Sequence, residues 1–215
     1  MVEIPTKHGG PRERRHSRHI QRKPASNLHH AVKVAARIGR PLNQFVTLSY
    51  AHTTCAPEEV SERFERLRQN HFGPWLRRPP RGVKEPCGPA AYVWVIEATN
   101  GIAVHWLVHV PATRLTDFKK RLPRWLKATA GEPTCDASAV HMRPAYNPMG
   151  AKLYMLKGMD ETVAKSWGIR PVPQGIIHGK RSGFSRSLGP TARRKIGYRP
   201  RRFVPSGTAQ AAPAP

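Results

Sequence analysis

Acidic residues are scarce in this chain of 215 residues. Asp and Glu number 13 against 37 Lys and Arg, so the formal net charge is +24 at pH 7, and no acid follows Glu161. A charge of this size repels itself and is best accommodated opposite a polyanion. Nucleic acid is the first candidate partner, because basic contacts with phosphates release counterions, and a membrane surface is the second. Composition alone favours a protein that only binds, such as a ribosomal or nucleoid protein, over an enzyme.

Long apolar runs are also missing. No stretch of about 20 apolar residues is present, so we expect no membrane span. The polar region from Thr6 to Asn27 lacks the apolar core of a signal peptide. The three cysteines are widely spaced without a CxxC motif, which is typical of reduced thiols in a cytoplasmic protein. The absence of a GxxxxGK(S/T) motif argues against an ATPase or helicase domain.

Both ends of the chain are rich in cations. Residues 1–40 contain ten Lys or Arg and five His, with acids only at Glu3 and Glu13. This composition predicts a basic disordered arm, in which His29 and His30 are solvated. Residues 191–215 are first basic and then rich in Pro and Ala, which predicts a disordered tail.

Between these ends, residues 41–190 show an orderly apolar pattern that predicts one folded domain. The pattern predicts strands at 44–50, 91–97, 102–110, 139–142 and 175–178. Asn100-Gly101 is a strong hairpin signal between two of them. Helical spacing predicts helices from about 57 to 71, from 115 onward and from 153 to 157. This order predicts an α+β fold: an antiparallel sheet with helices on one face, close to a split βαβ, or ferredoxin-like, arrangement.

Three short motifs follow one another in an informative order. They are Phe45-Val-Thr-Leu-Ser-Tyr50, Val104-His-Trp-Leu-Val-His-Val-Pro111 and Leu153-Tyr-Met-Leu-Lys-Gly158. Together they resemble the HUH endonucleases, the superfamily of rolling-circle replication initiators and relaxases. The resemblance extends over about residues 44–190. In that family, the first strand has a similar FxTLTY pattern, a central strand presents His-hydrophobic-His to a divalent metal ion, and a later helix carries a nucleophilic tyrosine.

The resemblance implies a catalytic role for Tyr154 and Lys157. Tyr154 would attack a DNA phosphate and leave a 5′-phosphotyrosine and a free 3′-hydroxyl. Because a phenol has a pKa near 10, it needs a nearby cation to react at neutral pH. Lys157 lies three residues further on and shares a helical face with Tyr154, so it is placed to hold a phosphate or to favour the phenolate. The alternative is an ordinary amphipathic helix with a solvated lysine.

The expected metal site departs from the family pattern. His105 and His109 are four residues apart, about 13 Å along a regular strand, so one ion cannot bind both without a bulge. In the alignment with the family, His105 falls on the second histidine and Ala103 on the first. Glu97 would then be the acidic ligand of Mg²⁺ or Mn²⁺, with His109, His141 or His178 as candidates for a further ligand. The alternative for His105 is a histidine that binds DNA or packs in the core.

Two basic patches are candidates for nucleic-acid binding. The loop Lys180–Gly189 supplies Lys180, Arg181 and Arg186 together with hydroxyls and one aromatic residue, a mixture suited to phosphates and a stacked base. Arg77 and Arg78 form a second patch beside Trp75. Trp94, Trp106 and Trp125 follow strand or helix patterns and are expected in the core.

Three functional hypotheses remain. The first is a tyrosine nickase that acts on single-stranded or hairpin DNA at the replication origin of a plasmid or phage-like element, with host replication machinery as a possible partner. The second is a catalytically inactive DNA-binding protein of the same fold. The third is a basic RNA-binding protein whose motif matches are accidental.

Overall fold

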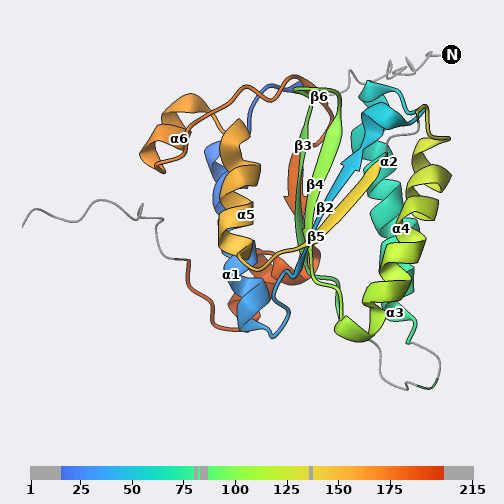
Figure 1. Ribbon diagram of the computed structural model, residues 1–215. Helices are drawn as coiled ribbons and strands as arrows, with labels where there is room; N and C mark the ends of the chain where they lie inside the picture. The colour runs from blue at the N-terminus through green and yellow to red at the C-terminus, as the bar shows by residue number, and fades with distance from the viewer. Residues whose placement is uncertain (1–15, 80–81, 83–86, 136–137, 201–215) are drawn as a thin grey trace, which may run out of the picture.

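The computed structural model describes residues 16–79, 82, 87–135 and 138–200, and it has an α+β architecture (Figure 1). The main sheet contains five strands in the order β5-β2-β4-β3-β7, and every neighbouring pair is antiparallel. The strands are β2 (Gln44–Ser49), β3 (Tyr92–Glu97), β4 (Ala103–Val108), β5 (Val140–Pro144) and β7 (Ser182–Phe184). The predicted α+β class and antiparallel sheet are confirmed. The strand order is compatible with a split βαβ arrangement but does not by itself define one.

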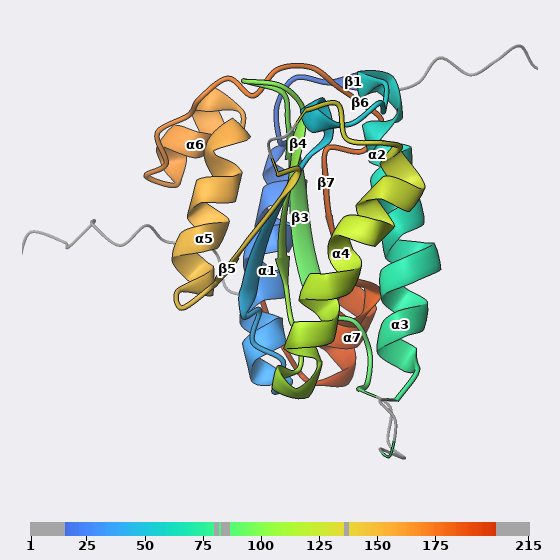
Figure 2. The same ribbon diagram turned by 45° about the vertical axis from the view of Figure 1, so that its right-hand side comes forward.

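Helices cover both faces of the sheet, not one face as the sequence predicted (Figure 2). One face carries α1 (Arg22–Arg37), α5 (Pro148–Met155), α6 (Glu161–Ser166) and α7 (Pro190–Lys195). The opposite face carries α2 (Val60–Arg66), the π-helical segment Leu67–Phe72, α3 (Gly73–Arg77) and α4 (Leu115–Ala130).

Two hydrophobic cores explain this layering. Successive side chains of a strand point to opposite faces, and both faces of β4 contribute apolar side chains to a core. Val104 and Trp106 pack in the core under α2 and α4, whereas Leu107 packs in the core under α1. Trp94 and Trp106 are fully buried, as expected. A central strand with two apolar faces requires cover on both sides, and the first helix of the chain supplies the second layer.

The prediction of a disordered arm over residues 1–40 is wrong for its second half. His16–Ser17 form strand β1, which pairs antiparallel with β6 (Ile177–His178), and α1 follows. His29 and His30 are buried in α1 rather than solvated, and His29 Nδ1 lies 2.9 Å from Lys152 Nζ in α5.

The remaining terminal predictions have mixed outcomes. Residues 1–15 and 201–215 lie outside the described residues. The predicted disorder of 191–215 is wrong at its start, because α7 extends over Pro190–Lys195. None of the described helices combines the length and apolar character that a bilayer span requires.

Candidate active site between the sheet and helix α5

A row of polar side chains crosses the sheet on the face that α5 covers. In the strand register, Thr47 of β2 lies opposite His105 of β4 on one side and His141 of β5 on the other. Glu97 is the last residue of β3 and lies opposite Ala103 at the start of β4. The hairpin at Asn100-Gly101 fixes this register and thereby places Glu97 beside His105.

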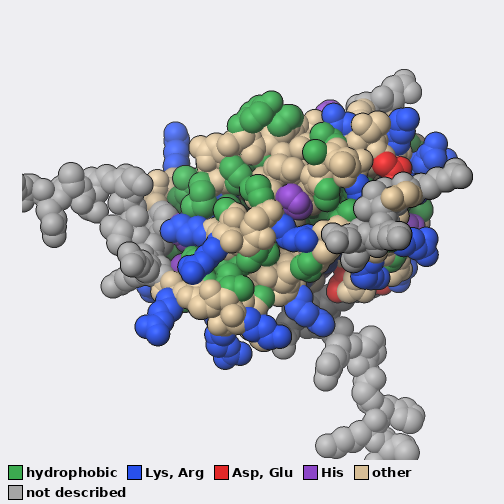
Figure 3. All heavy atoms as spheres, turned by 90° about the horizontal axis from the view of Figure 1, so that it is seen from below, with side chains coloured by type: hydrophobic (Ala, Val, Ile, Leu, Met, Phe, Trp, Pro, Cys, Tyr) green, Lys and Arg blue, Asp and Glu red, His purple; other side chains and the backbone are tan. Residues whose placement is uncertain are grey.

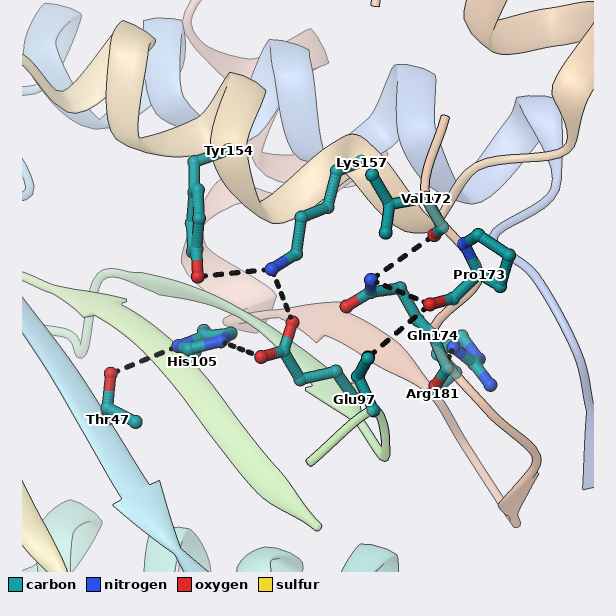
Figure 4. A network of polar contacts seen from close by, with 10 residues as sticks. Thr47, Glu97, His105, Tyr154, Lys157, Val172, Pro173, Gln174 and Arg181 are labelled. Atoms are coloured by element: carbon teal, nitrogen blue, oxygen red, sulfur yellow. Dashed lines mark hydrogen bonds and ion pairs between the residues drawn. The ribbon is translucent and has the colours of Figure 1, made fainter. Parts of the chain in front are cut away.

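The side chains of this row are in direct contact (Figure 4). Thr47 Oγ1 lies 3.0 Å from His105 Nδ1. On the other side of the ring, His105 Nε2 lies 2.7 Å from Glu97 Oε1. The imidazole of His105 is therefore held between a hydroxyl and a carboxylate, and it is only 5% exposed.

Helix α5 and the turn after it bring Tyr154 and Lys157 over the same point. The helix begins at Pro148, and the side chain of Asn147 caps it by accepting a hydrogen bond from the backbone N–H of Gly150. Lys157 Nζ lies 3.1 Å from Glu97 Oε2 and donates a hydrogen bond of 3.1 Å to Tyr154 Oη. Thr47, His105, Glu97, Lys157 and Tyr154 thus form one continuous chain of contacts, which we call the site network (Figure 4).

The electrostatics of the site network favour a charged Glu97–Lys157 pair. Burial by itself raises the pKa of Glu97, but the hydrogen bonds and charges of His105 and Lys157 outweigh it, so the pKa lies below its usual value. Burial by itself lowers the pKa of Lys157, but its contacts with Tyr154 and Glu97 dominate and raise it. Carboxylate and ammonium each stabilise the charged form of the other.

A cavity of about 310 Å³ opens beside the phenol of Tyr154. Tyr154 is 46% exposed, and its ring meets the ring of His105 edge-on with centroids 5.5 Å apart. Phe45 stacks on His105 at 5.5 Å, and the guanidinium of Arg143 lies 5.1 Å from the centroid of Phe45. The cavity therefore combines an accessible phenol, two aromatic walls and a cation, a composition suited to a nucleotide.

The expected metal site has only two of its donors in place. Glu97 and His105, which the sequence predicts as ligands of one metal ion, are in direct contact with each other. His109 points elsewhere, because its Nδ1 lies 2.8 Å from the carbonyl oxygen of Pro41, so its role as a ligand is a wrong prediction. His178 belongs to β6 and pairs with His16 in the two-stranded sheet, whereas Glu97 lies in β3 of the five-stranded sheet. Within the described ranges, no group of three or more His, Cys, Asp or Glu is placed to hold a metal ion.

These residues do not fit a divalent ion. Mg²⁺ requires near-octahedral oxygen coordination, and Mn²⁺ prefers similar oxygen-rich sites. Here, one oxygen of Glu97 contacts His105 and the other contacts the ammonium of Lys157. Ala103 occupies the position opposite Glu97, where a histidine would add a further donor.

The predicted basic patches are only partly available for binding. Arg181 is buried, and its guanidinium donates hydrogen bonds to the carbonyl oxygens of Ser17, Gln174 and Gly175. Its expected role in nucleic-acid binding is therefore corrected to a structural one. Lys180 and Arg186 are exposed.

Arg77 and Arg78 are exposed at the end of α3, on the face of the sheet opposite Tyr154. Arg78 lines a separate cavity of about 550 Å³ beside Trp75. In the view from below, Lys and Arg side chains are spread across the visible face, whereas the few visible acidic side chains lie toward its right-hand side (Figure 3). Positive charge therefore extends well beyond the site network.

Sequence reasoning missed three residues that shape the site. Thr47 lies within the first motif, and its pairing with His105 follows from strand register. Phe45 and Arg143 line the cavity from β2 and β5. Alternation along β2 indicates that Phe45 and Thr47 share a face, but the sequence does not show which strand supplies the cation.

Comparisons with known proteins add no relative. No family model, no curated protein and no solved structure gives a significant match to this chain. The chemistry of the site must therefore be argued from its own residues.

Proposed function

We propose that this protein cleaves single-stranded DNA by transesterification, with Tyr154 as the nucleophile. The observation that carries the proposal is the contact of the Tyr154 phenol with an ammonium that is itself held by a carboxylate, at the mouth of a cavity in a strongly basic protein. Tyrosine is one of the side chains that form covalent intermediates, provided that its hydroxyl is activated.

The proposed reaction exchanges one phosphate ester for another. Tyr154 Oη attacks the phosphorus of a phosphodiester, the Oη–P bond forms and the P–O3′ bond breaks. The phenol loses its proton, and the departing 3′-oxygen gains one and becomes a hydroxyl. The ammonium of Lys157 stabilises the developing phenolate. Because the phosphotyrosine keeps the phosphate ester activated, a 3′-hydroxyl can later reverse the reaction and rejoin the strand.

The surroundings of Tyr154 favour an unpaired strand as the substrate. The half-exposed ring of Tyr154 offers an aromatic surface for a base, and the exposed Arg143 offers a charge for its phosphate. The order of the three sequence motifs supports a role at the replication origin of a plasmid or phage-like element in the cytoplasm, on single-stranded or hairpin DNA. Host replication proteins would then be the further partners.

Covalent capture tests this proposal directly. The protein is incubated with a pool of single-stranded and hairpin DNAs and analysed on a denaturing gel, with and without Mn²⁺. The label is placed at the 3′ end, because the fragment that stays on a 5′-phosphotyrosine is the one downstream of the nick. We expect a shifted band for the native chain and none for Tyr154→Phe. Tyr146→Phe is the matched control, because Tyr146 is 92% exposed in the turn before α5. A band that persists in Tyr154→Phe contradicts the proposal.

A second candidate function is DNA binding without cleavage. It is favoured by the incomplete set of metal donors around Glu97 and His105. The same experiment separates the two functions when binding is measured in parallel by fluorescence anisotropy. Tight binding of single-stranded DNA without any adduct, across the whole pool, supports the binding protein.

A further inference from the structure

We propose that the ammonium of Lys157 serves as the cation of the site network, so that DNA cleavage by Tyr154 requires no divalent metal ion. This inference rests on the proposed function and names the group that activates its nucleophile. It departs from the expectation of a Mg²⁺ or Mn²⁺ site, and three observations lead to it.

The first observation is the position of Lys157 Nζ. A cation that assists a phenol must be held by a protein anion and must contact the oxygen that carries the developing charge. Nζ does both, at 3.1 Å from Glu97 Oε2 and 3.1 Å from Tyr154 Oη. An ammonium has three donors, and these two contacts use two of them. Nζ also lies 4.1 Å from the centroid of the Tyr154 ring, and we assign its third donor to a non-bridging oxygen of the scissile phosphate.

The second observation is that both carboxylate oxygens of Glu97 already have partners within the site network. His105 Nε2 contacts Oε1 at 2.7 Å, and Lys157 contacts Oε2. A divalent ion would compete with the Lys157 ammonium for Glu97, and among the described residues no third His, Cys, Asp or Glu is placed with Glu97 and His105 to hold it. Binding of an ion here would therefore break the Glu97–Lys157 ion pair and leave the protein's share of the coordination shell incomplete.

The third observation is that the chain itself holds the ammonium in position. Only 22% of the Lys157 side chain is exposed, and its Nζ contacts Glu97 and Tyr154 at the same time. The cation of the site network is therefore a fixed part of the fold.

A Mn²⁺ titration followed by electron paramagnetic resonance tests the identity of the cation without any cleavage. We expect the native chain and Glu97→Gln to titrate alike, with no saturable site at Glu97. A saturable site in the native chain that disappears in Glu97→Gln overturns the inference. The double variant Lys157→Met with Ala103→His removes the ammonium and adds a donor opposite Glu97. It is expected to gain a saturable Mn²⁺ site that the native chain lacks.

The covalent-capture experiment then tests the catalytic consequence. We expect equal adduct yields in EDTA and in Mn²⁺, and a decrease of about a hundredfold in Lys157→Met that Mn²⁺ does not restore. Lys165→Met is the matched control, because Lys165 also pairs with a glutamate, Glu161 at 2.8 Å, but on the exposed surface of α6. An adduct that forms only with Mn²⁺ overturns the inference and leaves the proposed function intact. If no adduct forms under any condition, the proposed function fails, and the Mn²⁺ titration still decides which cation the site holds.

Discussion

Mild acid should destabilise this fold because α1 buries two histidines. His29 is 2% exposed and His30 is 6% exposed. Burial, together with the charge of Lys152 and other cations, lowers the pKa of His29 from 6.5 to about 3. Burial and the charge of Arg193 lower the pKa of His30 from 6.5 to about 4. Both rings are therefore neutral in the folded protein at pH values where the unfolded chain protonates them.

The direction and size of the effect follow from these pKa values. Well above pH 6.5 both rings are neutral in the folded and in the unfolded protein, so these histidines contribute almost nothing to the pH dependence of stability. As the pH falls below 6.5, only the unfolded state gains protons, and the free energy of unfolding decreases. At pH 5 each ring lowers the free energy of unfolding by about 2 kcal/mol, and this value is nearly the same for a folded pKa of about 3 or about 4. Moving from pH 7.5 to pH 5 should therefore remove about 4 kcal/mol, a large part of the stability of a typical domain.

Urea denaturation followed by tryptophan fluorescence between pH 5 and 8 measures this effect. The double variant His29→Gln with His30→Gln keeps polar side chains but cannot titrate at these positions, so its stability should depend less steeply on pH over the same range. His16→Gln replaces an exposed histidine and should leave the native pH dependence in place. Equal pH dependence in the native chain and the double variant would refute the reasoning.

Three further predictions concern stability and binding. Arg181→Leu should lower the free energy of unfolding by about 2 to 3 kcal/mol, because it leaves buried carbonyl oxygens without donors. Arg186 is exposed, so Arg186→Ala should change the free energy of unfolding by less than about 0.5 kcal/mol in the same urea assay. Arg143→Ala should reduce the slope of log affinity for single-stranded DNA against log salt by about 0.7 if the guanidinium contacts one phosphate, and anisotropy titrations in increasing KCl measure that slope. Because the pKa of Glu97 is lowered in the folded protein, its carboxylate stabilises the fold above about pH 4.5 and loses that contribution when acid protonates it. Glu97→Gln should therefore lose less stability than the native chain below about pH 4.5, and acid titrations of both chains test this.

The strands were predictable because their signals are local. Alternating apolar residues and the Asn100-Gly101 turn predict a hairpin of 91–97 and 102–110, and the structure has β3 at Tyr92–Glu97 and β4 at Ala103–Val108. Turn chemistry fixes the register, and register places Glu97 near His105. This part of the site was therefore accessible to sequence reasoning.

Helix α1 was missed because its apolar face is unusual. Alanines supply much of its buried surface, such as Ala25 and Ala31, and His29 and His30 complete it. Judged by composition, such a segment has too little hydrophobic content to fold. The face is nevertheless continuous at helical spacing, and the hydrophobicity of a helix must be judged by its periodicity rather than by its mean.

The centre of the site depends on contacts that no local pattern encodes. The spacing of Tyr154 and Lys157 predicts that they share a helical face, and they are indeed in contact. The contact between Lys157 and Glu97 requires α5 to pack across the end of β3, which is a matter of tertiary structure. Arg181 is buried for the same reason. Its carbonyl partner Ser17 lies far away in the chain, and its partner Gln174 is brought close by the intervening loop.

The scarcity of acids in the chain and the lysine in the site have one physical explanation. Metal sites in nucleic-acid enzymes use carboxylates, together with substrate phosphates and water, to surround the ion with negative oxygen donors. This protein has 13 acidic residues against 37 Lys and Arg, and its site network contains one carboxylate, Glu97. In the proposed mechanism, this one carboxylate orients an ammonium that takes the place of a divalent ion. Under the proposed function, the same excess of cations would favour both binding of the strand and activation of Tyr154.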